Sequence, residues 1–234
     1  MQESYSQGIS RLKGEIVAIC HRMYQRHLIV ATDGNVSVRT GEQELIITRS
    51  GICKGEMTID DVITVDFEGN VLAGHGKPSS ELYMHIVAYE KRPDIGAIVH
   101  GHPPTAVAFT IAKQSLALCV IPEVILTMGN IPTIPYTTPT TSAVPEAVAR
   151  VIPYADAFML ERHGAVCVGK DLKDAYFKME KVEHAAEVTF KAHQLGEVQT
   201  LPLEEVKRLI GLREKFGLEG QNPLCNDCVV GCFE

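Results

Sequence analysis

The segments Ser79-Ser80-Glu81 and His100-Gly101-His102 hold the residue types most suited to chemistry. In a β-strand, residues two apart point to the same face and lie about 7 Å from each other. Two imidazoles placed in this way can bind one metal ion, and zinc accepts both imidazole nitrogens and carboxylates as ligands. A pair of hydrogen-bonded histidines at a strand end has the same spacing, so the pair alone leaves both interpretations open.

His163 and Glu81 are the candidates for further metal ligands. His163 precedes a glycine between two apolar segments, where a turn histidine bound by the backbone is the ordinary explanation. Glu81 falls in the expected first turn of a helix, where a carboxylate complements the helix dipole, and it has the i,i+4 spacing to His85. The residues therefore allow a four-ligand site without requiring one.

Three segments in the first third of the chain could bind an anion. Ser79 and Ser80 are preferred helix N-caps, but a helix start with free N–H groups also binds anions. Gly34-Asn35 and Ser50-Gly51 are turn signals first, and turns rich in N–H groups can form anion-binding nests. These segments suit a phosphate but do not demand one.

Hydrophobic periodicity and turn residues predict helices that flank and interrupt a set of β-hairpins. Helices are expected at 8–28, from Ser79 or Ser80 to about 92, at 145–152, at 172–195 and at 201–217. Hairpins are expected at 34–51, 61–74 and 157–169, a buried strand at 95–102 and an extended segment at 132–139. This order predicts an α/β layered domain around a mainly antiparallel sheet.

Length and charge restrict the class of protein. The chain has 234 residues and a net charge of −7, which argues against non-specific nucleic-acid binding. The N-terminus has no basic segment followed by an apolar one, and no apolar run reaches about 18 residues, so neither a signal peptide nor a membrane span is expected. We therefore expect a cytoplasmic protein without a disulfide framework.

The C-terminal tail contains three of the seven cysteines, Cys225, Cys228 and Cys232, in a C-x2-C-x3-C pattern. Zinc sites usually need four ligands, and a fourth is missing locally. We interpret residues 1–220 as one catalytic domain and residues 221–234 as an accessory tail without a catalytic role.

Taken together, the motifs resemble the class II aldolase/adducin family. "DGNVSVR", "TRSGI", "KPSSELYMH", "VHGHP" and "RHGAVCVG" occur in the order and spacing of that family, over roughly residues 10–220. Five motifs in register are far more specific than any one of them, and the pattern is most similar to the L-fuculose-1-phosphate aldolases. The resemblance implies a single three-layer α/β/α domain, and a homotetramer with active sites at subunit interfaces.

The resemblance also implies a set of site residues. The metal ligands would be Glu81, His100, His102 and His163, with Glu81 also transferring a proton. The substrate phosphate would be held by Gly34, Asn35, Ser50, Gly51, Ser79 and Ser80. The implied cofactor is one divalent ion per chain, Zn²⁺ first, with Mn²⁺ and Co²⁺ as alternatives. The implied reaction is reversible cleavage of a ketose 1-phosphate, such as L-fuculose 1-phosphate or a 5-deoxypentulose 1-phosphate, to dihydroxyacetone phosphate and a short aldehyde.

The sequence departs from the fuculose-phosphate aldolases at two tyrosine positions. The segment "VIPEVILTMGN" contains no tyrosine, and Phe216 stands where the second is expected. Glu123 is the only ionisable residue of that segment, so it is a candidate acid–base group, while a surface or salt-bridged Glu is the ordinary alternative. Relatives that dehydrate methylthioribulose 1-phosphate have an acid–base Glu in a similar segment.

Three other activities stay open within the family. These are a methylthioribulose-1-phosphate dehydratase, an L-ribulose-5-phosphate 4-epimerase and a non-catalytic adducin-like scaffold. In the epimerases the acidic residue after the two serines is usually Asp, whereas it is Glu81 here. A scaffold has lost metal ligands, whereas all four candidates are present here.

Overall fold

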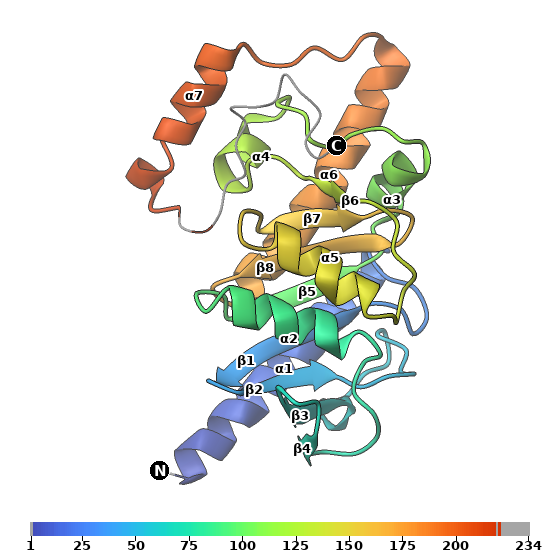
Figure 1. Ribbon diagram of the computed structural model, residues 1–234, viewed down its shortest axis with the longest axis vertical. Helices are drawn as coiled ribbons and strands as arrows, with labels where there is room; N and C mark the ends of the chain where they lie inside the picture. Colours follow the sequence, from blue (N-terminus) through green and yellow to red (C-terminus); the bar gives the residue numbers. More distant parts are fainter. Residues whose placement is uncertain (1, 219, 221–234) are drawn as a thin grey trace.

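One mixed sheet forms the middle of the molecule in the computed structural model, which describes residues 2–218 and 220 (Figure 1). Its eight strands run in the order β4-β3-β2-β1-β5-β8-β7-β6, and every neighbouring pair is antiparallel except β6 and β7. The strands are β1 (Asn35–Gly41), β2 (Glu44–Thr48), β3 (Val62–Asp66), β4 (Val71–Ala73), β5 (Ala97–Gly101), β6 (Thr133–Ile134), β7 (Ala157–Leu160) and β8 (Gly164–Gly169). The expected mainly antiparallel sheet is confirmed.

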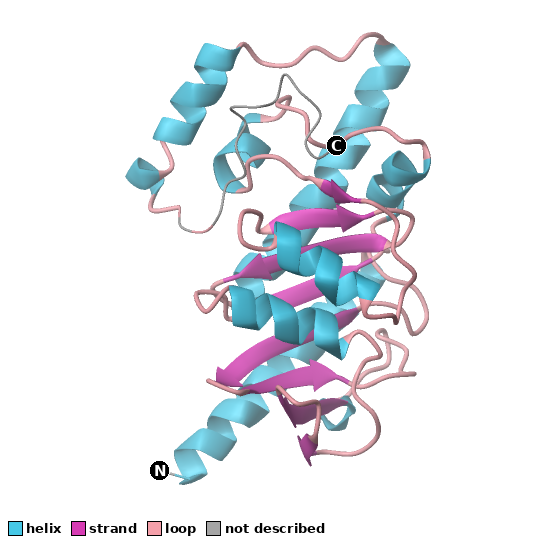
Figure 2. Ribbon diagram, viewed as in Figure 1, coloured by secondary structure: helices cyan, strands magenta, loops and turns pink. Residues whose placement is uncertain are grey.

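Helices cover both faces of this sheet, as Figure 2 shows. They are α1 (Gln2–Gln25), α2 (Leu82–Lys91), α3 (Pro104–Ile111), α4 (Pro122–Thr127), α5 (Ala143–Val151), α6 (Leu172–Leu195) and α7 (Leu203–Gly211), with short 3₁₀ turns at Ile59–Asp61 and Glu214–Phe216. In the view of Figure 1, α2 and α5 lie in front of the sheet, and α1 and α6 lie behind it. The three-layer α/β/α arrangement is therefore confirmed.

Each face of the sheet has its own hydrophobic core. Alternate residues of β8 belong to different cores, with Cys167 packed against the α1 and α6 side and Val166 against the α2 and α5 side. Successive side chains of a strand point to opposite faces, so a strand covered on both sides is apolar throughout. This explains why the continuous apolar run that ends at His100 is a buried central strand, β5.

The start of α2 differs from the expectation. The helix begins at Leu82 with Glu81 as its N-cap, so the expected start at Ser79 or Ser80 is wrong. Pro78 pairs with Arg49 as an isolated β-bridge, which keeps the chain extended up to the serines. The Ser79 hydroxyl then accepts a hydrogen bond from the N–H of Glu81 within a turn. The serines are thus part of a turn near the end of β2 and not of the helix.

Other boundaries shift for local reasons. Helices α3 and α4 were not expected, because Pro103, Pro104 and Pro122 mark segments that read as loops, whereas proline is well accepted at the first helical turn. The last expected helix ends earlier, at Gly211, and a separate 3₁₀ turn follows. The long helix α6 ends at Leu195 with Gly196 as its C-cap, as expected.

Three further features concern membrane spans, the cysteines and the C-terminal tail. No helix among the described residues is long and apolar enough to cross a membrane. Cys20, Cys53 and Cys167 are free thiols, but Cys119 takes part in a disulfide bond, which the sequence did not lead us to expect. The proposed tail with Cys225, Cys228 and Cys232 lies outside the described residues and stays a prediction.

Candidate metal and phosphate site

His100 lies at the centre of the site, in the middle of the sheet. It is fully buried near the end of β5, and its Nδ1 lies 2.9 Å from the carbonyl oxygen of Ala165 in β8. A carbonyl can only accept, so Nδ1 carries a proton, and Nε2 is the ring nitrogen that faces the rest of the site. His102 follows the strand, and its Nε2 lies 3.2 Å from Nε2 of His100. Two ring nitrogens therefore face each other, as the spacing predicted.

His163 reaches the same point from the turn between β7 and β8. Ring nitrogens of His100, His102 and His163 all lie within 4.8 Å of one another. Gly164 makes this possible, because a Cβ there would lie 2.3 Å from the carbonyl oxygen of Gly101 and 2.6 Å from Cδ2 of His102. Only glycine lets the turn approach β5 so closely.

The Glu81 carboxylate closes the cluster from the N-cap of α2. Its Oε2 lies 3.2 Å from Nε2 of His100 and accepts a hydrogen bond of 2.8 Å from the Asn35 side-chain amide. Its Oε1 lies 3.3 Å from Nε2 of His163 but forms no hydrogen bond, although it is buried. One carboxylate oxygen is thus held by the Asn35 amide, and the other lacks a hydrogen-bond donor.

The cluster is electrostatically suited to a cation. Burial lowers the pKa of His102 to about 3 and that of His163 to about 4. Burial would also lower the pKa of His100, but the Glu81 carboxylate outweighs it and raises that pKa, and the positive charge of protonated His100 adds to both other shifts. Burial would raise the pKa of Glu81, but His100, His163 and Asn35 outweigh it and hold that pKa well below its usual range. Metals bind neutral imidazoles and ionised carboxylates, so a cation bound here would take the place of the proton on Nε2 of His100.

Three converging imidazole nitrogens and an unsatisfied buried carboxylate oxygen fit a divalent metal ion. A buried polar atom without a partner is costly, so it needs a ligand to satisfy it. Nitrogen-rich sets with one carboxylate suit zinc and its neighbours better than calcium or magnesium. Among the described residues, this histidine group is the one cluster of three or more potential ligands within reach of a single ion.

A cavity of about 290 Å³ opens beside this cluster. All the residues expected to bind phosphate line it, namely Gly34, Asn35, Ser50, Gly51, Ser79 and Ser80, together with Glu81, His102 and His163. Gly34 and Gly51 have φ angles of +71° and +77°, which turn their backbones into the left-handed region. Backbone N–H groups in such turns can converge on an anion, so the expected phosphate residues surround one space.

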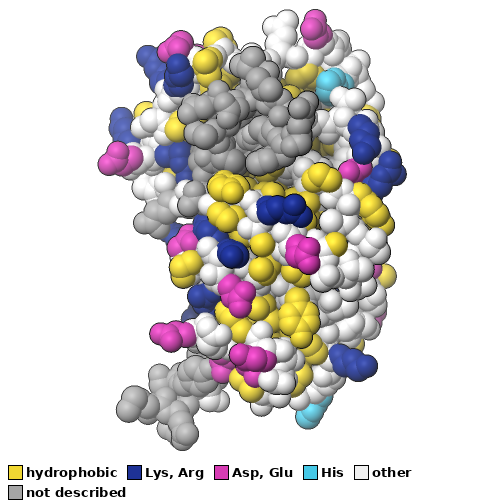
Figure 3. Space-filling view, viewed as in Figure 1, with side chains coloured by type: hydrophobic (Ala, Val, Ile, Leu, Met, Phe, Trp, Pro, Cys, Tyr) yellow, Lys and Arg dark blue, Asp and Glu magenta, His cyan; other side chains and the backbone are white. Residues whose placement is uncertain are grey.

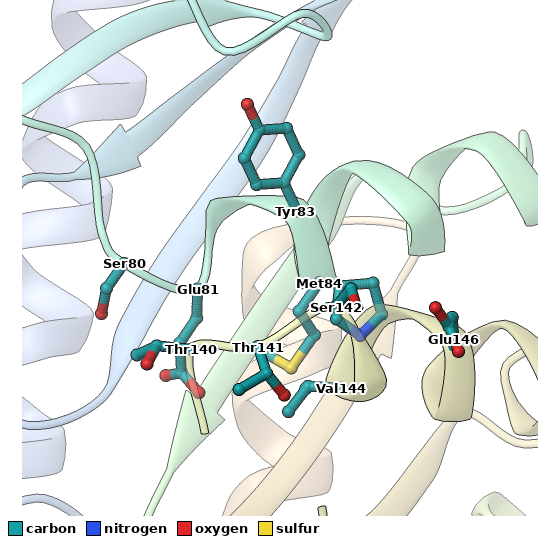
Figure 4. Close-up of a pocket in the computed structure, with 10 residues that line it drawn as sticks. Ser80, Glu81, Tyr83, Met84, Thr140, Thr141, Ser142, Val144 and Glu146 are labelled. Atoms are coloured by element: carbon teal, nitrogen blue, oxygen red, sulfur yellow. The ribbon is translucent and has the colours of Figure 1, made fainter. Parts of the chain in front are cut away.

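A second cavity of about 380 Å³ adjoins the first and shares Ser80, Glu81 and Thr140 with it. Figure 4 shows Ser80 and Glu81 on the segment that enters α2, and Thr140, Thr141 and Ser142 on the segment that enters α5. Thr140 has a φ angle of +64°, which is unusual for a β-branched residue and is typical of functional sites. Room for a substrate thus extends beyond the histidine cluster on the Glu81 side.

A family model described as "Class II Aldolase and Adducin N-terminal domain" matches residues 14–190. The chain belongs to the class II aldolase and adducin family. Within this family, it is 33% identical over 211 residues to a 5-deoxy-D-ribulose 1-phosphate aldolase of Bacillus thuringiensis serovar kurstaki, covering 89% of the chain and 98% of the relative. It is 34% identical over 181 residues to an L-fuculose phosphate aldolase of Methanococcus maripaludis, covering 77% of the chain and 97% of the relative.

Family members with other chemistry are also similar. A 3-oxo-tetronate 4-phosphate decarboxylase of Haemophilus influenzae is 30% identical over 198 residues, covering 83% of the chain and 93% of the relative. Among solved structures, an L-fuculose 1-phosphate aldolase has a TM-score of 0.80 at 30% identity, covering 88% of the chain and 96% of that structure. The fold of this family member is therefore that of the class II aldolases.

Two basic residues that the motifs did not single out also line the 290 Å³ cavity of this class II aldolase-type domain. Arg49 is paired with Asp61 at 2.7 Å. Lys54 is only 2% exposed, and its Nζ donates to the carbonyl oxygens of Thr32 and Ile52 at 2.9 and 3.0 Å. Lys54 follows Ser50-Gly51 by only three residues, so its place in the sequence could have indicated a cation beside that turn.

Glu123 lies away from these residues within one chain. It is exposed in the first turn of α4 and lines neither of the two cavities. Its charge acts on Lys181 of α6, where it counters the lowering of that pKa by burial. The expected acid–base group and the expected metal ligands are therefore separate in the single chain.

Proposed function

We propose that this chain is a metal-dependent class II aldolase that cleaves a ketose 1-phosphate reversibly to dihydroxyacetone phosphate and a short aldehyde. L-Fuculose 1-phosphate and 5-deoxypentulose 1-phosphates are the first candidate substrates, because relatives similar over most of the chain have such activities. The observation that carries the proposal is the convergence of three histidine nitrogens and the unpaired Glu81 oxygen beside the phosphate turns.

The proposed metal ligands are His100, His102, His163 and Glu81. Zn²⁺ is the proposed ion, with Mn²⁺ and Co²⁺ as alternatives, because these metals accept imidazole together with carboxylate. When bound, the ion would supply Lewis-acid stabilisation of negative charge on the substrate's carbonyl oxygen.

Positioning of the substrate is assigned to its phosphate. The backbone N–H groups of the turns at Gly34 and Gly51, with the hydroxyls of Ser50, Ser79 and Ser80, would hold it. Fixing the phosphate fixes the carbonyl carbon a set distance away, so the reacting bond is oriented toward the histidine cluster.

The proton transfers follow from the bond that breaks. In the retro-aldol step the β-hydroxyl loses its proton and becomes the aldehyde, and the electron pair of the broken carbon–carbon bond stays on the α-carbon as an enediolate. A proton delivered to this α-carbon completes dihydroxyacetone phosphate. Glu81 lies between the phosphate turns and the histidines, so we assign this proton transfer to its carboxylate.

The deciding experiment offers purified protein a panel of ketose 1-phosphates. Release of dihydroxyacetone phosphate is coupled to an NADH-consuming reductase, and the aldehyde is identified by mass spectrometry. Release that depends on added Zn²⁺ supports the aldolase. A changed pentulose phosphate without cleavage would indicate an epimerase, loss of water would indicate a dehydratase, and a protein without metal or turnover would indicate a scaffold.

Decarboxylation is the second candidate reaction, because the relative from Haemophilus influenzae is a 3-oxo-tetronate 4-phosphate decarboxylase. Loss of CO₂ from a 3-oxo acid leaves the same kind of electron pair next to a carbonyl, so the same residues could serve it. Release of CO₂ from 3-oxo-tetronate 4-phosphate, in place of aldehyde from the ketoses, would select this alternative.

Assembly into a cytoplasmic homotetramer with interfacial sites is part of the proposal. On the face covered by α2 and α5, hydrophobic side chains lie among acidic and basic ones (Figure 3). Tyr83 of α2 is 58% exposed. Glu123 could act only on the site of a neighbouring subunit. Light scattering tests the mass, and mixing inactive Glu81→Gln with inactive Glu123→Gln subunits tests the shared site, since mixed tetramers should regain activity.

A further inference from the structure

A buried row of hydrogen bonds leads from the interior of the protein to Glu81. Asn35 and Ser37 are two residues apart in β1, and His85 and Tyr89 are four residues apart in α2, so each pair presents one face to the other element. Tyr89, Ser37 and His85 are 0% exposed, and Asn35 is 4% exposed. This row of polar groups lies inside an apolar layer, and the proposed binding of metal and phosphate gives no role to Ser37, His85 or Tyr89.

The direction of each hydrogen bond can be assigned from Glu81 inwards. An ionised carboxylate only accepts, so the Asn35 amide nitrogen donates to Oε2 of Glu81 at 2.8 Å. The Asn35 oxygen must then face the other way, where it meets Nε2 of His85. An amide oxygen only accepts, so Nε2 of His85 carries a proton.

The remaining donors follow in the same direction. Ser37 Oγ lies 2.7 Å from Nδ1 of His85 and 2.9 Å from the hydroxyl of Tyr89. Complete burial disfavours a charged imidazole, so Nδ1 keeps a lone pair and accepts from Ser37. Ser37 in turn accepts from the Tyr89 hydroxyl. Every proton in the row therefore points toward Glu81.

We propose that His85 is a positioning residue, which fixes the side-chain amide of Asn35 so that its N–H group holds Oε2 of Glu81 and leaves Oε1 free. Without the N–H of His85, the oxygen of the Asn35 amide loses its donor. The orientation of the amide is then no longer fixed, and its N–H group is not held against Oε2 of Glu81. The spacing of Glu81 and His85 suggests a direct helical pair, but the contact runs through β1 instead. The inference rests on the proposed function of Glu81.

A double-mutant cycle tests whether His85 acts through Asn35. His85→Leu removes the donor, and we expect kcat to fall about 10–100-fold, as is usual when a residue that supports a ligand is lost. In an Asn35→Ala background the same change should lower kcat less than about twofold, because the intermediary is gone. His85→Gln restores an N–H donor and should recover most of the loss. If the two substitutions lowered kcat independently, so that their fold-changes multiplied in the double variant, the proposal would be overturned.

Ile86→Ala is the matched control for general damage to α2, since Ile86 is buried in the same helix outside the row. It should lower the melting temperature without changing kcat. If His85→Leu fails to fold, Ser37→Ala gives the same test from the other side of the imidazole. An unchanged kcat in soluble Ser37→Ala protein would also argue against the row.

Two readouts do not depend on aldolase activity. In zinc-loaded protein with ¹⁵N-labelled histidine, NMR should show His85 as the neutral Nε2–H tautomer, and an Nδ1–H tautomer or an imidazolium would overturn the assignment. Zinc affinity, measured by competition with a chelator, should weaken about 10–100-fold in His85→Leu. If no ketose phosphate were cleaved, the proposed function would fail while these measurements still decided the role of His85.

Discussion

At the scale of a single residue, the proposed roles of Glu81 are metal binding and proton transfer. One of its oxygens is held by Asn35, and the other is buried beside His163 without a donor. Such a carboxylate can bind a cation in the resting enzyme and exchange a proton with substrate during turnover. The low pKa of Glu81 that its histidine neighbours impose agrees with an ionised ligand.

The substitution Glu81→Gln separates these two roles. Glutamine keeps the size and one oxygen but cannot transfer a proton at neutral pH, so we expect kcat to fall about 10²–10⁴-fold. Deuterium exchange into dihydroxyacetone phosphate without any aldehyde measures this step directly. Exchange at the wild-type rate would mean that Glu81 only caps α2, and Glu123 would become the candidate.

Lys54 is a second residue that lines the cavity of about 290 Å³ and has a testable role. It is buried, it contacts two carbonyl oxygens, and among the described residues it forms no ion pair. A buried ammonium without a carboxylate is costly, and a bound phosphate would compensate it. Burial lowers the pKa of Lys54, and nearby acidic groups such as Asp33 offset this effect only in part.

For Lys54→Met we therefore expect KM for the phosphorylated ketose to rise about 10–100-fold, the loss of one charge-assisted hydrogen bond. Inhibition by inorganic phosphate should weaken in parallel. Lys77→Met is the matched control, because Lys77 is exposed and does not line the cavity. Equal KM values for the two variants would mean that Lys54 only ties the loops together.

At the scale of elements, strand pairing brings the residues of the histidine cluster together. Asn35 of β1 stands opposite His100 of β5 in the antiparallel ladder, and Gly101 stands opposite Ala165 of β8. Segments far apart in the chain thus place their functional residues at one end of three neighbouring strands. The turn before β8 completes the cluster, and its close approach depends on Gly164.

We expect Gly164→Ala to disrupt the cluster. The added methyl group would lie 2.3 Å from the carbonyl oxygen of Gly101 and 2.6 Å from a ring carbon of His102, so β5 and β8 must separate. Zinc affinity should fall at least about tenfold, and overpacking should cost about 1–3 kcal/mol of unfolding free energy. Gly211→Ala, where nothing lies within 4 Å, should change neither quantity adversely. Wild-type zinc affinity in Gly164→Ala would contradict this account of the turn.

A buried charge network joins the two helical layers at the scale of the whole molecule. Asp156, 1% exposed, accepts from Arg92 at the end of α2 and from Lys178 of α6, both at 3.0 Å. These helices lie on opposite faces of the sheet (Figure 1). The carboxylate just before β7 therefore connects both layers at the ends of the strands.

Asp156→Ala should leave two buried cations poorly compensated. Removing one partner of a buried ion pair costs about 3–5 kcal/mol, which for a chain of this size lowers Tm by roughly 6–20 °C. Asp94→Ala is the comparison, because Asp94 also pairs with Arg92 but its side chain is 54% exposed. Calorimetry should show that Asp94→Ala lowers the free energy of unfolding by at most about 1 kcal/mol. Equal losses for both variants would mean that burial of Asp156 adds nothing.

The sequence by itself determined the types of element and the motif residues. Alternating and continuous apolar runs identified the hairpins and the buried strand, and glycine at position 196 marked the end of α6, because these signals are local. The family motifs identified His100, His102, His163 and Glu81 as a set. Local signals failed at the prolines that begin α3 and α4, and at Ser79, where a β-bridge of the preceding residue competes with helix capping.

Only the tertiary structure decided how these residues meet. The strand order that brings β1, β5 and β8 together depends on contacts between distant segments, which no local pattern encodes. The same contacts bury Lys54 beside the turns at Gly34 and Gly51, separate Glu123 from the histidines, and direct His85 toward Asn35 instead of Glu81. Distances and burial set the charge and the hydrogen-bond direction of each group, so the chemistry of the site follows from packing around residues that the sequence can name.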